Sequence, residues 1–150
     1  MKKSIFNTSD NQEIINRIES LSPESKALWG KMSVDQMLSH CIAPIDIAFG
    51  NSNFKANFFM RLLGKMVKGK MLKQDVFNKN SPTAPSFIRS DKYDFEATRK
   101  ELIEKIKQFE TEGHIVIKNQ KHPFFGMMTY DEWDHLHYMH LNHHLQQFGV

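Results

Sequence analysis

The sequence lacks the features on which several protein classes depend. Cys41 is the only cysteine in 150 residues, so the chain forms no internal disulfide and holds neither a zinc ribbon nor a Cys-x-x-Cys redox motif. No apolar run reaches the roughly 18 residues of a membrane span, and residues 1–15 contain no continuous apolar segment of the kind found in secretion signals. The single thiol predicts a reducing compartment, and we expect a cytoplasmic protein.

Alternating patterns typical of β-strands are scarce, and only residues 114–118 (HIVIK) suggest a short strand. Apolar residues instead recur at helical spacing in four long segments, at about 10–21, 33–49, 94–112 and from Thr129 onward. Three of these segments begin with capping-box pairs, namely Ser9/Gln12, Ser33/Gln36 and Thr129/Glu132. The pattern predicts one all-α domain over residues 1–150, a four-helix bundle with at least one long crossover connection.

A short basic amphipathic helix is predicted at residues 54–68, inserted after the second long helix. Its apolar side carries Phe59, Leu62, Leu63 and Met66, and its basic side carries Arg61, Lys65 and Lys68. We interpret it as a lid over one end of the bundle with solvated lysines; contact with an anionic partner, a membrane surface or nucleic acid is the alternative. Because no DNA-binding or base-stacking motif accompanies it, we expect no nucleic-acid partner.

Five of the eight histidines lie within ten positions: His135, His137, His140, His143 and His144. Apolar residues recur between them at core-forming intervals, so the stretch belongs to the fold and is not an appended tag. At about 100° per residue, His140 and His144 share one helical stripe with His137, Trp133 and Gln147, and His143 lies at its edge. We expect His135 to point to the far side, toward water.

The pair His140 and His144 has the spacing of a bidentate metal half-site, because imidazoles four residues apart on a helix converge on one cation. Two ligands make a weak site, and His40 in the second helix is the expected third, with His114 and His122 as alternatives. A histidine pair on a solvated helix face is the structural alternative. Leu141 replaces the glutamate of His-Glu-x-x-His proteases, and a single Glu-x-x-His, from Glu132, argues against a di-iron bundle.

Four motifs occur in one order along most of the chain: LWGKMSVDQMLSHC (28–41), PTAP (82–85), HPFFG (122–126) and HLNHHLQQFGV (140–150). In these motifs the chain resembles the DinB-like (DinB/YfiT) superfamily, whose members are regarded as metal-dependent enzymes, and within it a branch of uncharacterised function. The resemblance implies a four-helix bundle with one histidine on the second helix and a His-x-x-x-His pair on the last. The matching residues here are His40, His140 and His144.

The same resemblance implies a three-histidine site with open positions, suited to zinc or nickel, with iron as a further option. Such a site activates water or a thiol against a small substrate, and a low-molecular-weight thiol with S-transfer is what the resemblance implies, with hydrolysis as the next option. Gln147 matches a glutamine of many members, although Leu145 and Gln146 replace their frequent Arg-Gly. A homodimer is compatible with this superfamily.

Three further residues are candidates for orienting the ligands or moving protons: His137, His143 and Gln147. For His137 and His143 we favour a packing or surface role. Cys41 is expected to be a buried, inert thiol rather than a nucleophile. The competing hypothesis for the whole chain is a catalytically silent helical bundle that binds a small apolar ligand or a protein partner.

Overall fold

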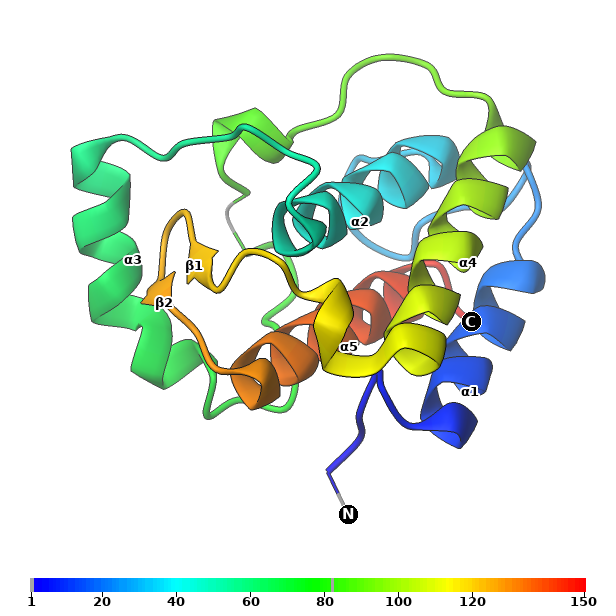
Figure 1. Ribbon diagram of the computed structural model, residues 1–150. Coiled ribbons are helices and arrows are strands. Elements are labelled where there is room, and N and C mark those ends of the chain that lie inside the picture. Colours follow the sequence, from blue (N-terminus) through cyan, green and yellow to red (C-terminus); the bar gives the residue numbers. More distant parts are fainter. Residues whose placement is uncertain (1, 82) are drawn as a thin grey trace.

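The computed structural model describes residues 2–81 and 83–150, and within these ranges it is predominantly helical (Figure 1). The α-helices are α1 (Thr8–Glu19), α2 (Val34–Phe49), α3 (Phe58–Met71), α4 (Phe95–Glu112) and α5 (Tyr130–Gln147). The short elements are the 3-10 helices η1 (Pro85–Phe87) and η2 (Gly113–Val116) and the antiparallel strands β1 (Lys121–His122) and β2 (Gly126–Met127). Pro82, which begins the PTAP motif, lies outside the described residues. The prediction of an all-α protein is confirmed.

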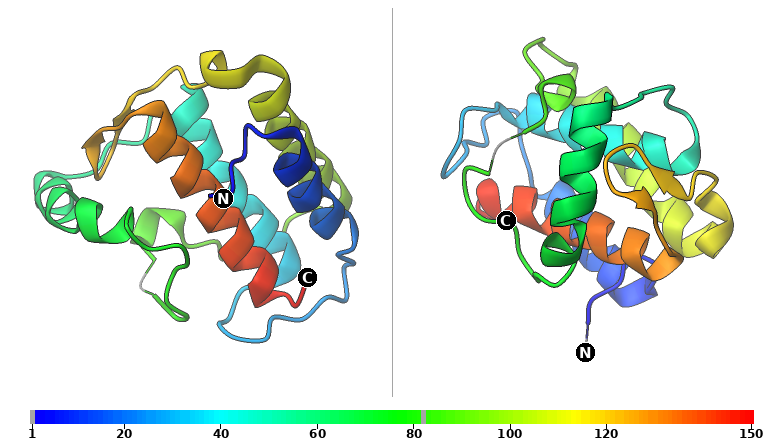
Figure 2. Two further views of the ribbon diagram at one scale, coloured as in Figure 1. Left: turned by 90° about the horizontal axis from the view of Figure 1, so that it is seen from below. Right: turned by 90° about the vertical axis from the view of Figure 1, so that its left-hand side faces the viewer.

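The core lies among α1, α2, α4 and α5, each of which contacts two or more of the others. Figure 1 and the left view of Figure 2 place α3 at the margin of this group, and the right view of Figure 2 shows it beside the hairpin β1–β2. Fully buried aliphatic and aromatic side chains such as Leu38, Ile45, Leu102, Ile106 and Phe109 fill the space between the helices. In the part of the chain that the structure describes, no helix combines the length and the apolar character needed to cross a membrane.

Capping residues explain where the two helices that carry the histidines begin. The amide of Ser33 donates to the Gln36 side chain at 3.1 Å, and that of Thr129 donates to Glu132 at 2.9 Å, as expected for capping boxes. The predicted pair at Ser9 is wrong. Asn7 caps α1 instead, because its side-chain oxygen accepts from two amides of the first turn.

The predicted strand at residues 114–118 is also wrong, since most of this segment forms η2. No neighbouring strand pairs with it among the described residues, and its backbone is held by the end of α2 instead. The amides of Lys118 and Asn119 both donate to the carbonyl of Ala48, each at 3.0 Å. Val116 and Ile117 thereby point into the core.

The sequence predicted that the apolar side of α3 packs on the bundle, but in the structure this side faces solvent. Phe58 and Met66 are 80% and 75% exposed, whereas Gly64 is buried against the backbone of Phe124, where a Cβ atom would not fit. Lys68 is not solvated as predicted, because it pairs with Glu132 at 2.8 Å and donates to the carbonyl of Met127 at 2.7 Å. The close approach at Gly64 and this ion pair hold the basic side of α3 against the protein.

Asn11 is a buried polar residue that joins α1 to its neighbours. Its side-chain amide donates to the carbonyl of Ile5 at 2.7 Å and to the carbonyl of Ile106 in α4 at 2.8 Å. Both hydrogen bonds are shielded from water, so no solvent molecule replaces them when the Asn11 amide is removed.

We therefore expect Asn11→Ala to lower the free energy of unfolding by about 1–3 kcal/mol. Asn16→Ala is the matched control, because Asn16 lies on the exposed side of the same helix. We expect a change within about 0.5 kcal/mol for this control. Urea denaturation measures both, and equal effects of the two substitutions would contradict the role of Asn11.

Candidate metal centre

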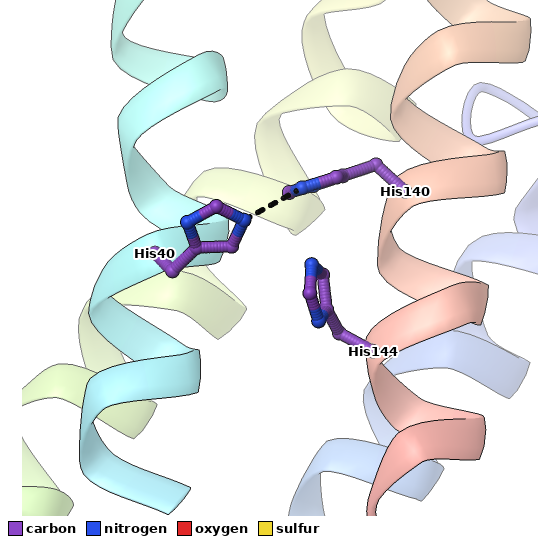
Figure 3. A group of neighbouring side chains, drawn as sticks. All are labelled: His40, His140 and His144. Atoms are coloured by element: carbon purple, nitrogen blue, oxygen red, sulfur yellow. Dashed lines mark hydrogen bonds between the residues drawn. The ribbon is translucent and has the colours of Figure 1, made fainter. Parts of the chain in front are cut away.

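Three histidine side chains converge between α2 and α5, with His40 from α2 facing His140 and His144 from α5 (Figure 3). One nitrogen atom from each ring lies within 4.8 Å of the other two. The Nε2 atoms of His40 and His140 are hydrogen-bonded at 3.0 Å. The ring centroid of His144 lies 4.7 Å from that of His40 and 4.6 Å from that of His140. Zinc binds imidazole nitrogens at about 2.0–2.1 Å, so one ion placed between the rings comes close to all three.

The orientation of His40 is set by a segment far away in the sequence. Its Nδ1 lies 2.9 Å from the carbonyl oxygen of Phe87, at the end of η1. A carbonyl only accepts hydrogen bonds, so Nδ1 carries the proton and Nε2 keeps its lone pair for the centre of the cluster. The segment that follows the PTAP motif therefore orients a candidate metal ligand.

The orientation of His144 depends on a two-step hydrogen-bond chain. Its Nδ1 donates to Oε1 of Gln147 at 2.8 Å, and Nε2 of Gln147 donates to the carbonyl of Trp29 at 2.7 Å. The carbonyl fixes which way the amide of Gln147 faces, and the amide in turn leaves Nε2 of His144 unprotonated. Gly30 has a φ of +81°, and a Cβ atom there would lie 2.5 Å from Nε2 of Gln147, so this close approach requires glycine.

Burial keeps the three rings neutral. Desolvation lowers the pKa of His40, and desolvation together with the neighbouring rings lowers the pKa of His144 to about 3. The same causes hold the pKa of His140 well below its ordinary value. At neutral pH the rings are therefore uncharged, which is the state of imidazole that binds a divalent metal.

A cavity of about 250 Å³ opens beside the cluster and shares its three histidines as part of the wall. The rest of the wall is mainly aromatic and aliphatic, and it includes Phe77, Phe87, Phe124, Phe125 and Leu136. No aspartate, glutamate, lysine or arginine lines the cavity among residues 2–81 and 83–150. The cavity suits a small ligand that is mostly apolar and uncharged.

Of the two alternative third ligands, neither joins the cluster. His114 is exposed and stacks on Tyr130 with ring centroids 4.7 Å apart. His122 lines the cavity, and its Nδ1 accepts from the amides of Phe124 and Phe125 at 3.1 and 3.2 Å. Its proton therefore sits on Nε2, which makes His122 a hydrogen-bond donor in the cavity wall, a role that spacing alone does not reveal.

The remaining histidines of α5 have separate environments. His135 does not reach water as predicted: it is buried, and its Nε2 donates to the carbonyl of Gln74 at 2.8 Å, because the segment after α3 covers this side of α5. His143 is partly buried and has ring contacts with Trp29 and Phe77. His137 stacks on Trp133 at 5.3 Å, and within the described ranges its Nε2 has no hydrogen-bond partner.

Cys41 lies next to His40 in the sequence but plays no part in the cluster. Its side chain is buried in the core, where Sγ is 3.7 Å from the sulfur of Met37. Desolvation strongly raises the pKa of this thiol, so it stays protonated and unreactive at neutral pH. The interpretation of Cys41 as an inert core residue is confirmed.

The chain matches a known protein family. Residues 2–149 match the model of a family described as "Protein of unknown function (DUF1569)". No curated protein and no solved structure matches the chain.

The burial of His137 predicts a dependence of stability on pH. Burial lowers the pKa of this ring to about 3, whereas an unfolded histidine titrates near 6.5. Between these values the unfolded state binds more protons, so stability is lost as the pH falls below about 6.5.

At about pH 5, His137 alone should account for a loss of about 2 kcal/mol relative to pH 7. His137→Phe keeps the stacking on Trp133 and removes the proton site. Urea denaturation with chelator present should show a loss between pH 7 and pH 5 that is about 2 kcal/mol smaller in this variant than in the wild type. Parallel losses in the two proteins would mean that His137 does not titrate in this way.

Proposed function

The chain belongs to the DUF1569 family, and from the geometry of its histidine cluster we propose that it is a divalent-metal-dependent enzyme. In this proposal His40, His140 and His144 bind the metal, with zinc or nickel preferred over iron because the ligands are all imidazoles. The reaction is the transfer of a thiol to a small substrate or the hydrolysis of that substrate. The proposal rests on one observation above all, which is the convergence of three neutral imidazoles, two of them buried and one partly buried, beside a cavity.

The surroundings of the ligands support a metal site rather than a packed polar core. Phe87 and Gln147 accept hydrogen bonds from the outer nitrogens of His40 and His144, which is the usual arrangement behind metal-bound histidines. If the cluster served packing alone, nothing would require the inner nitrogens of His40 and His144 to face the same point between the rings. Three protein ligands also leave coordination positions free, as catalytic sites require and structural zinc sites do not.

We further propose that the four core helices form a bundle of the DinB/YfiT type. Support comes from the placement of one histidine on α2 and the His-x-x-x-His pair on α5, in helices that pack together. The connection between α2 and α4, residues 50–94, contains α3 and η1 and is the long crossover expected for such a bundle.

A metal bound here would supply a Lewis acid that lowers the pKa of water or of a thiol. The protein itself would exclude bulk water and position the substrate. Phe77, Phe87 and Phe124 offer apolar contacts, and Nε2–H of His122 offers a hydrogen bond to an electronegative atom of the substrate. Because burial lowers the pKa of His122 to about 3, this ring orients the substrate as a neutral donor.

A second candidate function is a binding module without catalytic activity. The apolar wall of the cavity favours it, because such a wall binds small apolar ligands whether or not a metal is present. Purified protein without metal, whose melting temperature does not change when zinc or nickel is added, would support this alternative.

Elemental analysis of untagged protein prepared without chelator tests the metal centre. We expect about one zinc, nickel or iron per chain, and we expect His40→Ala and His144→Ala to lose it. His114→Ala is the control, because it removes an exposed histidine outside the cluster and should retain the metal. Retention of metal in both cluster variants would falsify the site.

The hydrogen bond behind His144 gives an independent test. Gln147→Leu keeps the size of the side chain and removes the acceptor, so we expect zinc affinity to fall about 10–100-fold in a chelator competition assay. Gln146→Leu changes the exposed neighbour and should leave affinity unchanged. If both glutamine variants bound zinc as tightly as the wild type, Gln147 would not orient a ligand.

A further inference from the structure

The side of α3 that faces solvent is unusually apolar. Six of the eleven exposed large apolar side chains in residues 2–81 and 83–150 lie on this helix. Five of them form the row that we call the outer face of α3: Phe58, Phe59, Leu62, Leu63 and Met66. At about 100° per residue they lie away from Gly64, which contacts the hairpin. All five side chains are at least half exposed, and α3 lies at the edge of the molecule (Figure 1).

Two exposed cations, Lys70 and Lys73, lie at and just beyond the C-terminal end of the outer face. By helical spacing Lys70 lies one turn beyond Met66 on the same side, whereas Lys55 lines a pocket between α3 and the hairpin. Residues 54–80 contain seven cations and one acidic residue, Asp75. Lys68 is held by Glu132, whereas Lys55, Lys70 and Lys73 make no ion pair within the described part of the chain. The surface therefore combines an apolar row with uncompensated positive charge.

We propose that the outer face of α3 binds the surface of an anionic lipid membrane. Phe58, Phe59 and Met66 would enter the boundary between headgroups and acyl chains, where an amphipathic helix lies in the plane of the membrane. Lys70 and Lys73 would reach the lipid phosphates, because the negative surface potential of anionic lipids attracts nearby basic side chains. The helix rests on the surface and does not span it.

The charge of the outer face argues against a second copy of the chain as its occupant. A two-fold interface pairs the same patch with itself, so Lys70 and Lys73 of one copy would lie at the same interface as those of the other. Asp75 alone does not neutralise these cations. An anionic lipid surface buries the apolar row and also neutralises the lysines. A contact between two copies of the outer face would bury the apolar row but would bring the lysines together.

Docking through α3 would also place the cavity near the lipid. Met71, the last residue of α3, and Phe77, six residues later, both line the cavity beside the histidine cluster. The segment that carries the outer face thus forms part of the cavity wall. This connection is independent of whether the cluster is catalytic.

Co-sedimentation with vesicles tests the proposal on the intact chain. We compare vesicles of phosphatidylcholine with vesicles that contain about one third phosphatidylglycerol, at low salt and at about 0.5 M salt. We expect binding to the anionic vesicles only, and weaker binding at high salt. Wild-type protein that stays in the supernatant with anionic vesicles at low salt overturns the proposal.

Two sets of variants separate the contribution of the lysines from that of the apolar row. Since each lysine near an anionic surface contributes about a fivefold factor, the double variant Lys70→Glu/Lys73→Glu should bind at least about tenfold more weakly. The double variant Phe59→Glu/Met66→Glu should no longer sediment with vesicles. The controls are Lys100→Glu/Lys107→Glu on α4 and Ile115→Glu at an 80% exposed site, and both should bind like the wild type.

Circular dichroism confirms that each variant is folded, which is expected because all substituted side chains are exposed. Equal binding by the α3 variants and the controls would overturn the proposal. Light scattering tests whether a second copy of the chain occupies the outer face instead. A dimer that dissociates on Phe59→Glu/Met66→Glu would assign the outer face to a second copy and overturn the lipid proposal.

Discussion

The candidate site depends on histidine rings that stay neutral while one nitrogen of each ring faces the centre of the cluster. Water would solvate these rings and allow them to separate or to take up protons, so the arrangement exists only because α2 and α5 remove His40 and His144 from solvent. Burial alone does not orient an imidazole, because either nitrogen can carry the proton. Carbonyl and amide oxygens behind the rings make that choice.

The groups that make this choice come from parts of the chain far from the histidines in sequence. The carbonyl of Phe87 belongs to the crossover between α2 and α4, and the carbonyl of Trp29 belongs to the loop before α2. Each is a backbone atom whose position follows from the path of its loop. The cluster is therefore a product of the whole fold, and a correct histidine spacing on α5 does not by itself create it.

The sequence predicted the parts of the structure that local rules determine. The start of α2 at Ser33, the start of α5 at Thr129 and the shared side of His140 and His144 follow from capping and from helical periodicity. Burial of His135 and the reversed orientation of α3 did not follow, because both depend on which surface another segment covers. His40 was the expected third ligand on the sequence, and the packing of α2 on α5 brings it to the cluster while His114 and His122 stay outside.

The contact between Gly30 and Gln147 joins two of the motifs that stand at opposite ends of the sequence. A side chain at position 30 would occupy the space of the glutamine amide, and a shorter residue at position 147 would leave the Trp29 carbonyl and His144 without their shared partner. A substitution at position 30, far from the cluster in sequence, would therefore disturb the hydrogen bond that orients His144.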